Sequence, residues 1–181
     1  KQEKRLSMLL KKKILLINAE SKSEIINIEK IAKSKNKKVN IGIRLNPNTD
    51  PKTLDQISTG KKDDKFGVSE KIFLDLIKYV NNSKSLNLKC LSVHIGSQIL
   101  NHRPYEKMIR VIEKVLKKSN FQFEYIDLGG GMGINYDNQK IKLNLKKYSK
   151  IVEKFVKKYR SKIIFEPGRS IIGNAGILIS K

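Results

Sequence analysis

Short apolar runs alternate with amphipathic segments along this chain, and this alternation restricts the fold more than any other feature. Five apolar runs have the length and composition of strands: Ile14–Ile17, Val39–Leu45, Leu88–Ile95, Tyr125–Leu128 and Ile163–Phe165. Four segments have helical spacing: Ser23–Ser34, Ser69–Val80, Tyr105–Lys118 and Leu145–Tyr159. Residues Lys1–Lys12 resemble the end of another helix. The pattern predicts an α/β fold with a parallel sheet covered by helices.

Polar and glycine-rich clusters follow four of the expected strands. They are Arg44–Pro47, His94–Gln98, Gly129–Gly133 and Glu166–Arg169. Right-handed crossovers bring the carboxyl ends of parallel strands to one edge, where β/α barrels carry their active sites. A closed barrel needs about 250 residues. We therefore expect either an open α/β sheet or part of a (β/α)8 barrel, with about five of its eight strands.

Three consecutive glycines, Gly129, Gly130 and Gly131, follow the fourth expected strand. Glycine has no Cβ to keep a ligand away, and successive exposed N–H groups form a nest suited to a phosphate. The alternative is a flexible turn between strand and helix. The spacing does not fit the dinucleotide fingerprint, because no helical pattern follows at once.

Glu166 comes directly after the apolar run Ile163–Phe165, so its carboxylate starts from a poorly solvated position. Such a group needs a cationic or N–H partner. A protonated ring nitrogen is one candidate, and an internal ion pair with a lysine is the other. Pro167 stiffens the following turn, Gly168 allows close approach of the backbone, and Arg169 offers a fork for phosphate or carboxylate.

Three further residues lie at the same predicted edge. His94 ends a strand, and its imidazole either stacks on a ring-containing ligand or is an ordinary core histidine. Ser97, in the next turn, can donate to a phosphate. Arg44 needs an acidic partner or a ligand, so it is either a supporting site residue or half of a structural ion pair.

The net charge of +22 raises the question of nucleic-acid binding. Nearly all of this charge is lysine on the polar faces of expected helices, and the six arginines are scattered. We expect no specific nucleic-acid partner, since base readout favours arginine. No apolar run is long enough for a membrane span, and no membrane partner is expected. Cys90 is the only cysteine, so we expect a buried thiol and a cytoplasmic location.

Three segments together resemble the pyridoxal-phosphate-dependent ornithine/diaminopimelate/arginine decarboxylases, and the diaminopimelate branch in particular. They are Leu91–Ile99, Ile126–Ile134 and Glu166–Gly176. Further similarity runs through Arg44–Pro47, Ile57–Gly60 and Lys65–Gly67. The resemblance covers nearly the whole chain in the correct order, and it implies a β/α barrel.

The resemblance also implies a cofactor, pyridoxal 5'-phosphate, and a role for each site residue. Glu166 would pair with the pyridine nitrogen and His94 would stack on the ring, in a supporting catalytic role. Arg169 would lie near the substrate carboxylate, and no metal ligand is implied. The cofactor-binding set is His94, Ser97, Gly129, Gly130, Gly131, Glu166, Pro167, Gly168 and Arg169.

The implied reaction is decarboxylation of meso-diaminopimelate to L-lysine and CO2, the last step of lysine biosynthesis, by a homodimer. The alternatives are ornithine, arginine or carboxynorspermidine as the amino-acid substrate, or a noncatalytic remnant that binds pyridoxal phosphate. We expect residues 1–175 to form the partial barrel and residues 176–181 to begin a β domain. The family's Schiff-base lysine is expected outside this chain. The isolated chain is therefore expected to be inactive, and to be poorly soluble or oligomeric.

Overall fold

The computed structural model describes residues 2–9, 12, 14–51, 58–60, 66–136, 142–177 and 179. Within them, five strands form one sheet in chain order, and every neighbouring pair is parallel. The strands are β1 (Ile17–Ala19), β2 (Val39–Arg44), β3 (Leu86–Ser92), β4 (Tyr125–Asp127) and β5 (Lys162–Ile164). The predicted parallel α/β fold is confirmed.

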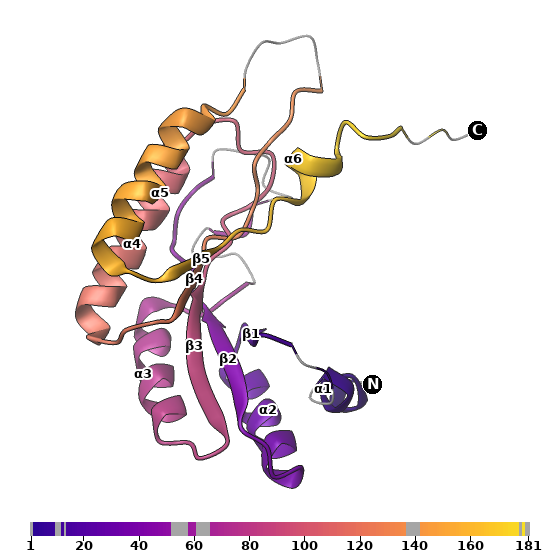
Figure 1. Cartoon of the computed structure of the whole chain (residues 1–181), viewed down its shortest axis with the longest axis vertical. Helices are drawn as coiled ribbons and strands as arrows, with labels where there is room; N and C mark the ends of the chain where they lie inside the picture. Colours follow the sequence, from indigo (N-terminus) through magenta and orange to yellow (C-terminus); the bar gives the residue numbers. More distant parts are fainter. Residues whose placement is uncertain are drawn as a thin grey trace.

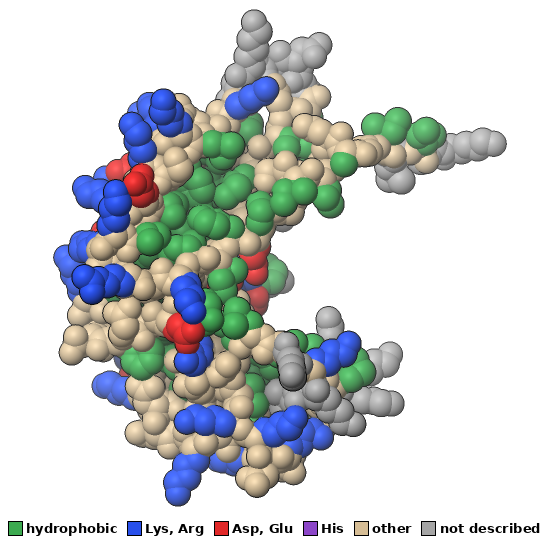
Figure 2. Space-filling model, viewed as in Figure 1, with side chains coloured by type: hydrophobic (Ala, Val, Ile, Leu, Met, Phe, Trp, Pro, Cys, Tyr) green, Lys and Arg blue, Asp and Glu red, His purple; other side chains and the backbone are tan. Residues whose placement is uncertain are grey.

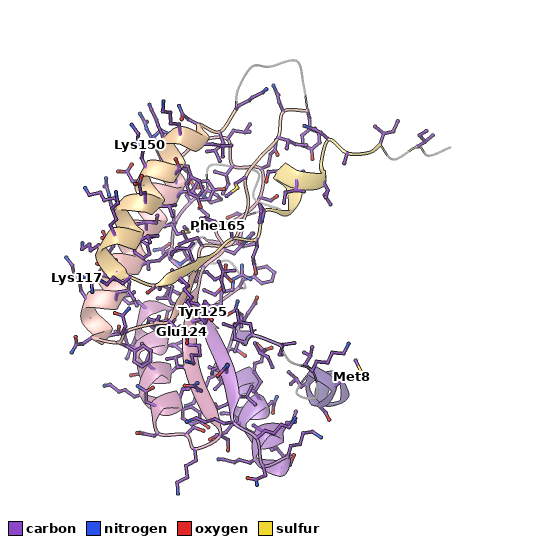
Figure 3. The ribbon with its side chains drawn as sticks, viewed as in Figure 1. Met8, Lys117, Glu124, Tyr125, Lys150 and Phe165 are labelled. Atoms are coloured by element: carbon purple, nitrogen blue, oxygen red, sulfur yellow. The ribbon has the colours of Figure 1, made fainter. Side chains whose placement is uncertain are left out.

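Most of the helices cover the outer side of this curved sheet (Figure 1). The helices are α1 (Gln2–Leu9), α2 (Lys22–Ser34), α3 (Glu70–Asn81), α4 (Arg103–Ser119), α5 (Leu145–Tyr159) and α6 (Gly168–Ile172). Figure 1 shows α2 to α5 along the outside of the curve, with both chain ends on its open side. Lys117 and Lys150 project from α4 and α5 away from the sheet, as expected for solvated helix faces (Figure 3).

The strand register separates the two faces of the sheet. Aligned residues at one level are Ile43, Leu91, Ile126 and Ile163. The next level is Arg44, Ser92, Asp127 and Ile164. Because successive strand residues point to opposite faces, these rows face opposite ways. The first row is apolar and packs into the core, so the second row, which is polar except for Ile164, lines the open face.

All five predicted strands have shifted boundaries. β2 and β4 each end one residue earlier than expected, at Arg44 and Asp127. Ile14 and Leu15 are exposed, and β1 begins only at Ile17, because pairing with β2 is confined to three residues. β3 starts at Leu86 and leaves the ladder after Ser92, earlier than expected. β5 ends at Ile164, one residue before Phe165. The short helix α6 lacked a periodic signal and was not predicted.

The predicted apolar helix faces form the core. α4 buries residues at helical spacing, and α3 packs Phe73 against Phe123 with ring centroids 6.1 Å apart. Cys90 is fully buried with a free thiol, as predicted, and burial raises the pKa of this thiol to about 12. None of the helices within the described ranges is long and apolar enough to cross a membrane.

Hydrophobic side chains are exposed along the edge strand β5, between α5 and α6 (Figure 2). Phe165 is 42% exposed and Ile172 on α6 is 69% exposed. Beyond α6, Ile177 and Ile179 are exposed, whereas residues 178, 180 and 181 lie outside the described residues. The domain boundary expected at residue 176 therefore stays a prediction. So does the self-association expected of the isolated chain.

Candidate functional site

His94 is held at the carboxyl end of β3 by contacts on several sides. Its Nδ1 accepts a hydrogen bond from the Gly130 N–H over 3.2 Å. Its carbonyl accepts from Thr59 Oγ1 at 2.9 Å and from the Arg44 guanidinium at 3.3 Å. Burial, followed by the nearby Arg44 charge, lowers the pKa of the imidazole. The ring is therefore a fixed, neutral group, and its Nδ1 acts as an acceptor.

The glycine turn lets the ends of three strands approach closely. Gly129 and Gly131 have φ values of 64° and 84°, which disfavour any side chain. A Cβ on Gly130 would lie 1.9 Å from the Glu166 carbonyl oxygen, and one on Gly131 would lie 2.1 Å from the Gly96 carbonyl oxygen. At Gly130 and Gly131 the missing side chain thus makes room for neighbouring backbone.

Two of the three glycine N–H groups are already used inside the protein. Gly129 donates to Asp127 Oδ1 at 2.9 Å, and Gly130 donates to His94. The expectation of three successive free N–H groups is therefore wrong for these two. Within the part of the chain that the structure describes, Gly131 alone of the three keeps an N–H without a protein acceptor.

Glu166 follows β5 and reaches the same edge. Its N–H donates to the Gly129 carbonyl over 2.8 Å, which joins the ends of β4 and β5. Burial raises the pKa of the carboxyl, the Asp127 charge raises it further, and Arg44 opposes the shift. No lysine among the described residues pairs with Glu166, so the internal lysine ion pair is not observed. Figure 3 labels Phe165, the residue before it.

Arg169 and Ser97 form a second corner of this edge. Arg169 Nε donates to Ser97 Oγ at 3.0 Å, and its Nη1 donates to the Tyr136 hydroxyl. The guanidinium also lies over the Tyr136 ring, 5.7 Å from its centroid. Tyr136 was not predicted, and its only sequence signal is its place in the loop after the glycine turn. Two donors of the kind that bind phosphate thus lie together.

Arg44 forms the structural ion pair that was one of its two expected roles. Its Nη1 lies 2.6 Å from Glu20 Oε1, and its guanidinium lies over the Phe66 ring. Because Arg44 also contacts the His94 carbonyl, it supports the site from the side. Thr59, from the described part of the Ile57–Gly60 segment, does the same, whereas Ile57 and Lys65 lie outside the described residues.

Asp127 is the most buried charged residue at this edge, and it was not predicted as a site residue. It ends β4, is 1% exposed, and accepts hydrogen bonds at both carboxylate oxygens.

Pro167 and Gly168 follow Glu166 in the sequence. Pro167 is the N-cap residue of α6, and Gly168 is the first residue of this helix. A Cβ on Gly168 would meet nothing within 4 Å. Gly168 is thus the open position next to the acid.

The predicted site residues therefore come together in two neighbouring groups. The first joins His94, Gly129, Gly130 and Glu166 by backbone and side-chain contacts. The second joins Ser97 and Arg169. Gly131 lies between the groups, because it packs against the Gly96 carbonyl beside Ser97. A flat acceptor ring, a carboxyl and a phosphate-type corner thus share one edge of the sheet.

Comparison with known proteins decides the family. A family model described as "Pyridoxal-dependent decarboxylase, pyridoxal binding domain" matches residues 1–173. The chain belongs to this family. Diaminopimelate decarboxylase of Aquifex aeolicus is 38% identical over 185 residues, which cover 100% of this chain and 44% of that protein.

Solved structures of pyridoxal-dependent decarboxylases have the same fold. Diaminopimelate decarboxylase of Helicobacter pylori, complexed with L-lysine, has a TM-score of 0.88 at 37% identity, over 93% of this chain and 43% of that one. The M. jannaschii enzyme in co-complex with L-lysine has a TM-score of 0.81 at 32% identity, over 93% of this chain and 41% of that chain. The chain thus spans less than half the length of these relatives, and its five strands are part of a (β/α)8-type barrel.

Proposed function

We propose that this chain forms the pyridoxal-phosphate-binding part of a decarboxylase that converts meso-diaminopimelate into L-lysine and CO2. Family membership supports the cofactor, and the names of the relatives support the substrate. The observation that carries the proposal is the packing of Gly130 between His94 and Glu166. Gly130 thus contacts the His94 imidazole through its N–H and packs closely against the backbone of Glu166.

The residues at this edge fit pyridoxal phosphate. Glu166 has no cationic partner among the described side chains that would compete with a ring nitrogen, and its pKa is already raised by burial. Neutral His94 offers a flat face for stacking. Ser97, Arg169 and the free N–H of Gly131 would hold the phosphate, with Gly129, Gly130, Pro167 and Gly168 lining the approach.

When bound, the cofactor supplies a ring that accepts the electron pair left behind by departing CO2. Glu166 would hold a proton at the ring nitrogen, because a carboxylate beside that nitrogen stabilises its charged form. His94 would exclude water from one face of the ring. Arg169 would orient the substrate carboxylate through its guanidinium fork.

A substrate profile of the complete protein tests this proposal. With pyridoxal phosphate present, CO2 release should be fastest, by kcat/KM, on meso-diaminopimelate. Higher kcat/KM on ornithine, arginine or carboxynorspermidine would move the protein to another branch of the family. Retention of the cofactor with no CO2 release from any of these would instead indicate a noncatalytic remnant.

We also propose that the complete protein is a cytoplasmic homodimer that binds an amino-acid substrate and no specific nucleic acid. The resemblance to the family supports the dimer, and the single buried thiol of Cys90 is compatible with a reducing compartment. Sedimentation equilibrium and cell fractionation test the two parts separately. A monomer at micromolar concentration would contradict the first part, and recovery outside the cytoplasm would contradict the second.

A further inference from the structure

Asp127 has a hydrogen-bond environment that no assigned role explains. Its Oδ1 accepts from the Gly129 N–H at 2.9 Å. Its Oδ2 accepts from Asn18 Nδ2 at 3.0 Å and from Ser92 Oγ at 3.1 Å. Donors from three strands or strand ends thus converge on one buried carboxylate. Asp127 is therefore fixed in position and cannot turn away from its neighbours.

Glu166 lies beside this fixed acid, because both residues are bound to Gly129: the Gly129 N–H donates to Asp127 Oδ1 at 2.9 Å, and the Gly129 carbonyl accepts from the Glu166 N–H at 2.8 Å. In this position the Asp127 charge is the second cause, after burial, of the raised pKa of Glu166. Other charged or titratable groups near Glu166 come from the remaining strands. They are Arg44 with its partner Glu20, the buried thiol of Cys90, and neutral His94. Arg44 opposes Asp127, but it is already paired with Glu20.

We propose that Asp127 is a positioning residue that acts through Glu166, and that it makes the site select a protonated ring nitrogen over a neutral ring. Two adjacent carboxylates repel each other, and a cation at the open side of Glu166 relieves that repulsion. Asp127 thereby increases the binding free energy that a cationic ring nitrogen contributes, without touching the ligand. The inference rests on the proposed function, since it concerns the same cofactor site.

Two neutral replacements separate this role from simple support of the fold. Asp127→Asn and Asp127→Ser both keep an acceptor within reach of the Gly129 N–H. The asparagine can be accommodated because Asn18 Oδ1 is a buried acceptor without a partner, so the Asn18 amide can turn to meet the new NH2 group. The matched control is Ser92→Ala, which removes one hydrogen bond to Asp127 but leaves its charge in place.

The first measurement uses the complete protein without cofactor. Carboxyl 13C NMR follows the titration of Glu166, with Glu166→Gln used to assign its signal. In both Asp127 variants the Glu166 carboxyl should titrate at a lower pH than in the parent. In Ser92→Ala its titration should stay close to that of the parent. An unchanged Glu166 titration in the folded variants would overturn the proposal. Failure of both variants to fold would also overturn it, since Asp127 would then be a purely structural residue.

The second measurement compares the affinities for pyridoxal phosphate and for its 1-deaza analogue, which has carbon in place of the ring nitrogen. Both share the same aldehyde and phosphate, so their affinity ratio isolates the nitrogen. Asp127→Asn should reduce the preference for pyridoxal phosphate by about tenfold, the size of a single charge interaction in a partly buried site. An unchanged ratio would contradict the proposal. If the parent protein binds neither compound, the proposed function fails, while the titration still decides whether Asp127 acts on Glu166.

Discussion

The N–H of Gly130 donates to Nδ1 of His94 over 3.2 Å and so connects the end of β4 to the end of β3. This hydrogen bond requires a lone pair on Nδ1, so the neutral imidazole carries its proton on Nε2. The position of one proton in the candidate site is therefore set by a backbone group of the glycine turn.

His94 should stay neutral to lower pH than an exposed histidine. Because its pKa is lowered in the folded protein, folding disfavours the protonated ring, and stability should fall as the pH drops below about 6.5. Urea unfolding of the parent and of His94→Gln between pH 5 and 8 measures this. The parent should lose more stability than the variant toward pH 5, and 15N NMR should show the Nε2–H tautomer. Parallel pH profiles would contradict the expectation.

Gly130 should tolerate no side chain. In Gly130→Ala the new Cβ would lie 1.9 Å from the Glu166 carbonyl oxygen, which is backbone and cannot rotate away. We expect a loss of about 1–3 kcal/mol in the free energy of unfolding, as for other overpacked positions. Gly168→Ala is the matched control, because its Cβ would enter open space. Equal losses in the two variants, measured by urea unfolding, would show that the close approach is not the cause.

Glu29 should stabilise the contact between α2 and α3 in a pH-dependent way. It accepts hydrogen bonds of 2.6 Å from Ser83 and Tyr79, which, together with Lys33, lower the pKa of the carboxyl to about 2. Because the pKa is depressed in the folded protein, the contribution is complete above about pH 4.5 and is lost toward pH 2. Glu29→Gln should cost about 2 kcal/mol at pH 7.

The difference between the parent and Glu29→Gln should shrink steadily between pH 5 and 3. Tyr79→Phe, which removes one of the two hydroxyl donors, should give a smaller loss with the same pH trend. Thermal unfolding across this range is the measurement. A loss that does not depend on pH would show that packing, and not the charge of Glu29, holds the two helices together.

Arg169 should contribute to phosphate binding through its forked geometry. Arg169→Lys keeps the charge but loses the planar fork, so the affinity of the complete protein for pyridoxal phosphate should fall by about 10-fold or more. Arg110→Lys is the control, because Arg110 pairs with Glu106 on the exposed side of α4. Equilibrium dialysis measures both. An unchanged affinity in Arg169→Lys would remove Arg169 from the phosphate corner.

Periodicity was sufficient to predict the sheet, the helices other than α6, and the edge on which the site lies. The apolar faces of α3 and α4 and the polar ends of the strands are local features, so they can be read without knowing the fold. His94 and Glu166 were predicted to share an edge for this reason. Their actual connection through Gly130 depends on strand register, which local spacing does not give.

The residues that the sequence did not reveal are ordinary residues placed by tertiary contacts. Asp127 became a candidate only when its three donors were seen, and Tyr136 only when Arg169 was found against its ring. The glycine turn shows the opposite case. Its sequence revealed the missing side chains, but it could not show that Val93, Gly96 and Glu166 backbone atoms fill the space.

The register of β4 has a further consequence for insertions and deletions. Asp127 faces the open side because Ile126, one residue earlier, lies in the apolar row against the helices. Adding or removing one residue within β4 would exchange these two positions and press a carboxylate into the helix layer. The length of this short strand is therefore constrained as strictly as its amino acids, and loop-length variation in such proteins is expected elsewhere.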